Sequence, residues 1–108
     1  MADLHERLAQ ATGFEWDAGN ATKNWTKHAV SQSECEQVFF NVPLVLAVDR
    51  AHSGREGRVF ALGQTDVGRL LLVVFTLRGA NVRVISARPL SRSEREVYRN
   101  AQAEEGAE

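Results

Sequence analysis

The sequence has few of the residues and runs that mark several large classes of protein. A single cysteine, Cys35, is found among its 108 residues, so no disulfide can form within the chain, and a reducing compartment fits. The longest apolar run, Leu70–Phe75, is far shorter than the roughly 20 residues that a membrane-spanning helix needs. Residues 1–13 carry charges where a signal peptide would need an apolar segment. We therefore expect a cytoplasmic protein that has no disulfide and does not enter a membrane.

The sequence also lacks the short motifs of common cofactor and metal sites. It contains no phosphate-binding glycine loop, no dinucleotide fingerprint and no Gly-x-Ser-x-Gly nucleophile turn. Its histidines, His5, His28 and His52, and its one cysteine do not have the spacing of zinc ligands. We expect neither a metal nor a cofactor.

What is present fits one small soluble domain. The hydrophobic fraction of 44% and the charged fraction of 25% are ordinary for a globular chain, and a chain of this length can bury one core. We predict an N-terminal extension over residues 1–13, a folded domain over residues 14–100 and an acidic tail over residues 101–108.

Charge is unevenly distributed although the net charge is only −1. Residues 1–49 hold three basic and seven acidic side chains, residues 50–99 hold ten arginines and four acidic side chains, and residues 100–108 hold three acidic ones. A basic middle region can attract a polyanion. Charge alone favours the simpler interpretation of a solvated, salt-bridged surface.

Apolar spacing and capping signals predict the helices. A short helix is expected within residues 1–12, and a longer one over Ala18–His28 begins after an N-cap at Asp17. The longer helix should turn Ala21, Trp25 and His28 to one side and Asn20, Lys23, Asn24 and Lys27 to its polar side.

Two Ser-x-x-Glu capping boxes predict further helices, one beginning at Ser31 with Glu34 and the other at Ser91 with Glu94. The first should bury Cys35, Val38 and Phe39, and the second should turn Val97, Tyr98 and Ala101 inward.

Between these helices the period changes to that of strands. Besides a short strand at Phe14–Trp16, the pattern predicts Leu44–Val48, Arg58–Leu62, Arg69–Leu77 and Val82–Ala87. Short connections indicate an antiparallel meander, and the unbroken run Leu70–Phe75 indicates a central strand covered on both faces. In the last strand, simple alternation puts Val82, Val84, Ser86 and Arg88 on one face. The fold class is α+β: two helices, an antiparallel sheet of about four to five strands and a C-terminal helix.

Basic side chains are the residues that could carry chemistry here. Cleavage of RNA without a metal needs a base for the 2′-hydroxyl proton, cations for the charge on phosphorus and an acid for the leaving 5′-oxygen. The candidates are Lys23, Lys27, His28, Arg58, Arg69, Arg83 and Arg88.

Each candidate also has a structural interpretation. His28 ends a helix, where it can simply interact with the helix dipole, and the lysines can belong to a solvated helix face. Arginines along strands can oppose aggregation. Arg88 can cap a neighbouring carbonyl or pair with Glu94, and Tyr98 fits the core better than a catalytic role.

The order of segments resembles the BrnT family of type II toxins, within the RelE-like ribonucleases. The resemblance covers residues 14–98 and is carried by the ordered set Asn24-x-x-Lys27-His28, Gly68-Arg-Leu, Phe75-Thr and Ile85-Ser-Ala-Arg88. The sequence departs from the family at Ala29, where a glycine commonly follows Lys-His, and at Gln32, where an aromatic residue is common.

The resemblance implies a RelE-like fold and metal-independent RNA cleavage that blocks translation. It also implies a BrnA-type antitoxin that binds operator DNA, with the toxin dimeric in that complex. On this basis we predict Lys27, His28, Arg58 and Arg88 as catalytic and Lys23, Arg69, Arg83 and Arg95 as RNA-binding. The lack of a clear acid–base pair leaves an alternative open, a non-catalytic module that binds an antitoxin and co-represses its operon.

Overall fold

The computed structural model describes residues 3–49 and 57–106. Along the chain it contains α1 (Leu4–Ala9), β1 (Gly13–Glu15), α2 (Ala18–His28), α3 (Gln32–Val38), β2 (Val45–Asp49), β3 (Arg58–Gln64), β4 (Leu70–Arg78), β5 (Asn81–Pro89) and α4 (Arg92–Gly106). This order confirms the predicted α+β class. Within the described residues, no helix is long and apolar enough to cross a membrane.

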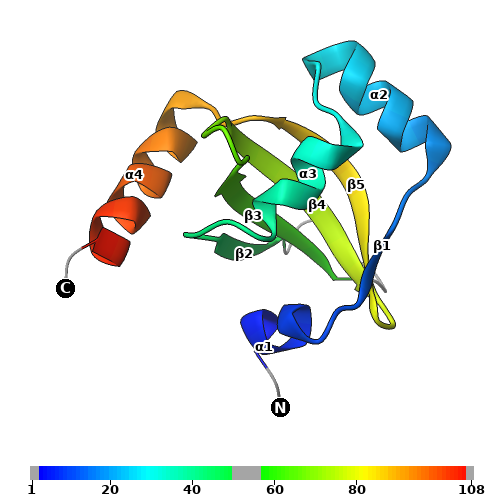
Figure 1. Cartoon of the computed structure of the whole chain (residues 1–108), viewed down its shortest axis with the longest axis horizontal. Coiled ribbons are helices and arrows are strands. Elements are labelled where there is room, and N and C mark those ends of the chain that lie inside the picture. The colour runs from blue at the N-terminus through cyan, green and yellow to red at the C-terminus, as the bar shows by residue number, and fades with distance from the viewer. Residues whose placement is uncertain (1–2, 50–56, 107–108) are drawn as a thin grey trace.

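The five strands form one sheet in the order β1-β5-β4-β3-β2 (Figure 1). Strands β2 to β5 pair antiparallel with their neighbours, which confirms the predicted meander. Strand β1 joins as a parallel partner of β5 and pairs only along Asn81–Arg83. Within residues 3–49 and 57–106, the remainder of β5 therefore has no strand on its outer edge.

Each face of the sheet packs into its own hydrophobic core, and the central strand β4 contributes to both. Leu71, Val73 and Phe75 pack with the buried residues of α3, and α1 adds its apolar side chains to the same core. On the opposite face Leu72 packs with Leu90 and with Tyr98 of α4. We call these the α3 face and the α4 face. The prediction that Leu70–Phe75 would be covered on both sides is confirmed.

Both capping boxes form as predicted. The Ser31 hydroxyl accepts from the Glu34 backbone N–H while the Glu34 carboxylate accepts from the Ser31 N–H. Ser91 and Glu94 make the same reciprocal pair at the start of α4. The helix α4 continues through most of the predicted acidic tail to Gly106.

The inward stripe of α4 is narrower than expected. Tyr98 is completely buried, and its hydroxyl donates to the Pro43 carbonyl at 2.7 Å, which confirms its place in the core. Val97 was predicted to point inward, but 52% of its surface is exposed. Tyr98 is the one described residue of α4 that is fully buried, and it packs with Leu62, Leu72 and Leu90.

The orientation predicted for α2 is wrong. Trp25 is 60% exposed, whereas Asn24, placed on the polar side by helical spacing, is only 3% exposed. The cause is the short β1 strand, which leaves the backbone of β5 uncovered beyond Arg83. Asn24 Oδ1 accepts from the Ala87 N–H at 3.1 Å, so a polar side chain is what this sheet edge requires.

The alternation predicted for β5 is also wrong past Val84. The pairing with β4 shifts between Val74 and Phe75, so that Phe75 lies opposite Val84 but Val74 lies opposite Ser86. This irregularity adds one residue to β5 and reverses its side chains. Ala87 consequently joins the core of the α3 face, and Arg88, paired with Leu72, points to the α4 face.

Candidate functional site

A pocket of about 220 Å³ lies between α2 and the strands β4 and β5. It is lined by Lys23, Asn24, Lys27, His28, Leu72, Val74, Ser86, Ala87 and Arg88. Side chains from two distant parts of the chain therefore meet at one concave surface. Four of the eight predicted site residues are among them: Lys23, Lys27, His28 and Arg88.

Two local features bring these groups together. Helix α2 packs along the outer edge of β5, which places Lys23 and Lys27, one turn apart, over the sheet. The irregularity in β5 turns Ser86 and Arg88 to the side of the sheet on which this pocket opens. Without that extra residue, Arg88 would point into the opposite core.

Glu94 of α4 holds the guanidinium of Arg88. Two hydrogen bonds of 2.8 Å join Nη1 and Nη2 to the two carboxylate oxygens, and Nη1 also donates to the Pro89 carbonyl at 3.1 Å. The hydrogen bonds from Arg88, aided by those from Ser91, outweigh burial and hold the pKa of Glu94 at about 2. The same pairing raises the pKa of Arg88. Both groups are therefore charged at neutral pH.

The ion pair with Glu94 leaves some N–H donors of Arg88 available for a ligand. A guanidinium carries five N–H donors, and three of them donate in the contacts just described. The remaining donors lie on a side chain that lines the pocket and is 40% exposed. Arg88 is thus an oriented cation that keeps donors for an oxyanion.

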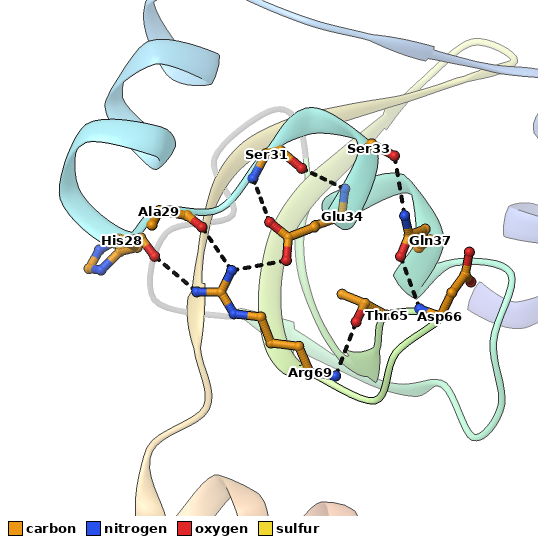
Figure 2. A network of polar contacts seen from close by, with 9 residues as sticks. All are labelled: His28, Ala29, Ser31, Ser33, Glu34, Gln37, Thr65, Asp66 and Arg69. Carbon is orange, nitrogen blue, oxygen red and sulfur yellow. Dashed lines mark hydrogen bonds and ion pairs between the residues drawn. The ribbon is translucent and has the colours of Figure 1, made fainter.

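Arg69 lies outside the pocket and joins the two helices that precede it (Figure 2). Its guanidinium donates to the His28 carbonyl at 3.0 Å, the Ala29 carbonyl at 2.7 Å and the Glu34 carboxylate at 3.0 Å. Burial raises the pKa of Glu34, but hydrogen bonds from Ser31 and Arg69 outweigh it, so the net pKa is lowered. Arg69 therefore fixes the end of α2, where His28 lies.

The link between α2 and α3 depends on one backbone conformation. Ala29 has a φ of 52°, in the left-handed region that favours glycine. Its carbonyl accepts a hydrogen bond from Arg69, and its own N–H donates to the Trp25 carbonyl at 2.9 Å. A glycine at this position would adopt that conformation without strain.

The remaining predicted residues do not line the pocket. Arg58, at the start of β3, and Arg83, in β5, are both half-buried and point to the α4 face by alternation, some way along the sheet from the pocket. Arg95 is exposed on α4 and donates to the Leu90 carbonyl at 3.3 Å. The RNA-binding roles predicted for Arg83 and Arg95 therefore require RNA that extends beyond the pocket, whereas the catalytic role predicted for Arg58 requires it to reach the reacting phosphate.

Sequence reasoning missed two residues of the site. Asn24 was part of the quoted Asn-x-x-Lys-His pattern, but helical spacing placed it among solvent-facing residues. Ser86 was not among the predicted candidates, because the irregularity that turns it toward the pocket has no evident signal in the sequence. Over residues 3–49 and 57–106, no three His, Cys, Asp or Glu side chains gather in a way that could hold a metal ion.

Comparison with known proteins adds independent information. The family model described as ribonuclease toxin, BrnT, of type II toxin–antitoxin system matches residues 16–94. The crystal structure of the Brucella abortus ribonuclease toxin BrnT superposes with a TM-score of 0.55 and 20% sequence identity, over 76% of this chain and all of that one. At that identity the structural likeness shows the fold alone. No curated protein matches the chain in sequence.

Proposed function

The chain belongs to the BrnT family of ribonuclease toxins of type II toxin–antitoxin systems, and we propose that it cuts RNA without a metal at the pocket between α2 and β5. The observation that carries this proposal is the meeting of Lys23, Lys27, His28 and Arg88 around one cavity. A phosphodiester carries its charge on two oxygens, and fixed cations are what a site needs to bind it and to stabilise additional charge.

The proposed reaction uses the RNA's own 2′-hydroxyl. The 2′-oxygen attacks phosphorus and loses its proton to a base, the bond from phosphorus to the 5′-oxygen breaks, and an acid protonates that oxygen. The products are a 2′,3′-cyclic phosphate and a free 5′-hydroxyl. No water, metal or redox partner enters this balance.

We assign roles by the chemistry of each side chain. An imidazole is the side chain best suited to move protons near neutral pH, and among the described residues His28 is the only imidazole that lines the pocket. Arg88, held by Glu94, would bind the non-bridging oxygens of the phosphate through its remaining donors. Lys27, with Lys23 one turn earlier, would add charge from the helix side.

We also propose a cellular role and a partner for the protein, as the family resemblance implies. The toxin would stop growth by cutting RNA needed for translation. A BrnA-type antitoxin would neutralise it, bind operator DNA and hold the toxin as a dimer in the complex.

The test is cleavage of a labelled RNA oligomer by purified protein in the presence of excess EDTA. We expect cutting to persist with the chelator and to yield cyclic-phosphate ends. His28→Gln and Arg88→Ala should each lower the rate by about 10²-fold or more. Arg99→Ala, which changes an exposed arginine on α4, is the matched control. Cleavage that the chelator abolishes would contradict metal independence.

Growth provides a second measurement. Induced expression should arrest a bacterial culture, and co-expression of the antitoxin should restore growth. If the purified protein leaves RNA intact yet tightens binding of the antitoxin to operator DNA, the chain is instead a non-catalytic co-repressor.

A further inference from the structure

Asn24 lies at the inner wall of the pocket, and its side-chain amide could make one more hydrogen bond. Its side chain is 3% exposed, and it lines the cavity together with Lys23, Lys27 and Arg88. One end of its amide is used, because Oδ1 accepts from the Ala87 N–H. The other end, Nδ2, is buried and has no hydrogen-bond partner among the residues that the structure describes.

The direction of this amide is not arbitrary. A backbone N–H can only donate, so the atom that faces Ala87 must be the oxygen and the free atom must be the nitrogen. A buried amide donor without an acceptor destabilises a protein appreciably. Such an atom, beside a cationic cavity, indicates a place where a ligand supplies the missing acceptor.

We infer that Asn24 Nδ2 donates a hydrogen bond to a non-bridging oxygen of the RNA phosphate bound in the pocket. This inference rests on the function proposed above. The basic lining selects the acceptor, because an occupant among Lys23, Lys27 and Arg88 is most stabilised when it is an oxyanion. Asn24 thereby adds a neutral, geometrically fixed donor to a set of cations.

A hydrogen bond to the sheet fixes the position of this donor. The Oδ1 bond fixes the amide to β5, the strand that also carries Arg88. Asn24, although it belongs to α2 as the two lysines do, is therefore anchored to the strand that carries Arg88, so that the two side chains can approach one phosphate together. Because Nδ2 has almost no contact with solvent, an oxygen reaches it after neighbouring side chains shift, and Lys23 and Lys27 are exposed enough to do so.

The direct test observes the amide itself in the wild-type chain. Side-chain amide resonances are followed by NMR while a 2′-O-methyl RNA oligomer, which cannot supply the attacking hydroxyl, is titrated in. The Asn24 resonance pair is identified by its absence from an Asn24→Asp sample. We expect both of its protons to shift as the oligomer binds, whereas the amide of exposed Asn100 stays in place. An Asn24 amide that does not move at saturation would overturn the inference.

Cleavage kinetics supply the second test. Asn24→Asp keeps an oxygen for the Ala87 N–H and replaces the donor with an acceptor, so the rate should fall by about 10²-fold. Asn100→Asp makes the same chemical change at an exposed position of α4 and should cut as the wild type does. Wild-type activity in Asn24→Asp would refute the assignment. A wild-type chain that binds the oligomer through Asn24 but never cuts RNA would instead refute the proposed function alone.

Four RNA substrates that differ only in the base at the cleavage position show whether Nδ2 donates to a phosphate oxygen or to a base. A phosphate contact predicts that Asn24→Asp slows all four substrates by the same factor. A loss confined to one base would mean that Nδ2 reads a base oxygen or nitrogen, and the phosphate assignment would be wrong.

Discussion

Among residues 3–49 and 57–106, Ala29 is the only residue other than glycine with a positive φ. An L-amino acid in the left-handed region costs about 1–2 kcal/mol, and glycine avoids most of that cost. Part of the gain is lost because glycine makes the unfolded chain more flexible. We predict that Ala29→Gly raises the free energy of unfolding by about 0.5–1 kcal/mol, measured by urea denaturation.

The control is Ala103→Gly, at an exposed position within α4. It makes the same change where φ is helical, and it should lower stability by up to about 1 kcal/mol. If both variants are destabilised alike, the backbone at Ala29 is not strained.

At the scale of elements, the junction of α2 and α3 is held by the side chain of Arg69, the residue just before β4. Arg69 contacts two carbonyls at the end of α2 and a carboxylate at the start of α3. We predict that Arg69→Lys lowers the free energy of unfolding by about 1–3 kcal/mol, because an ammonium cannot reproduce the fork of the guanidinium. RNA cleavage should fall as well, since His28 loses its support.

Lys23→Ala is the comparison that separates support from binding. Lys23 is exposed and lines the pocket, so its removal should weaken RNA binding with little change in melting temperature. If Arg69→Lys also leaves the melting temperature unchanged and loses only RNA affinity, Arg69 is an RNA contact as first predicted.

The sequence was sufficient for those elements whose signals are local. Capping boxes mark where α3 and α4 begin, and the apolar run in β4 marks a strand buried on both faces. The face of α2 was predicted wrongly because helical spacing counts apolar residues, whereas the open edge of β5 needs a hydrogen-bond acceptor. The reversal in β5 depends on its pairing with β4, which a single strand cannot reveal.

At the scale of the whole molecule, the candidate site follows from how helix and sheet are stacked. The residues around the pocket come from α2 and from β4 and β5, and the list of basic residues alone could not separate Arg88 from Arg58. Leu62 of β3 and Arg88 of β5 both pair with Leu72 of β4, so these two residues lie at the same level in the sheet. Arg58 lies four residues from Leu62 along β3, on the same face. Measured along the strands, Arg58 is therefore about 13 Å from the level of Arg88.

This spacing predicts how RNA binding depends on salt and on RNA length. Each cation that neutralises a phosphate of single-stranded RNA contributes about −0.7 to the slope of log affinity against log salt concentration. With a long 2′-O-methyl RNA oligomer, Arg58→Gln should make the slope about 0.7 less steep. With a dinucleotide, which fills the pocket only, the same variant should bind as the wild type does. Arg99→Gln, on the exposed part of α4, should change neither slope. If Arg58→Gln weakens the binding of the long oligomer and of the dinucleotide equally, Arg58 lies at the reacting phosphate, as the catalytic role predicted from the family resemblance requires. In that case the proposal that RNA extends along the α4 face is wrong.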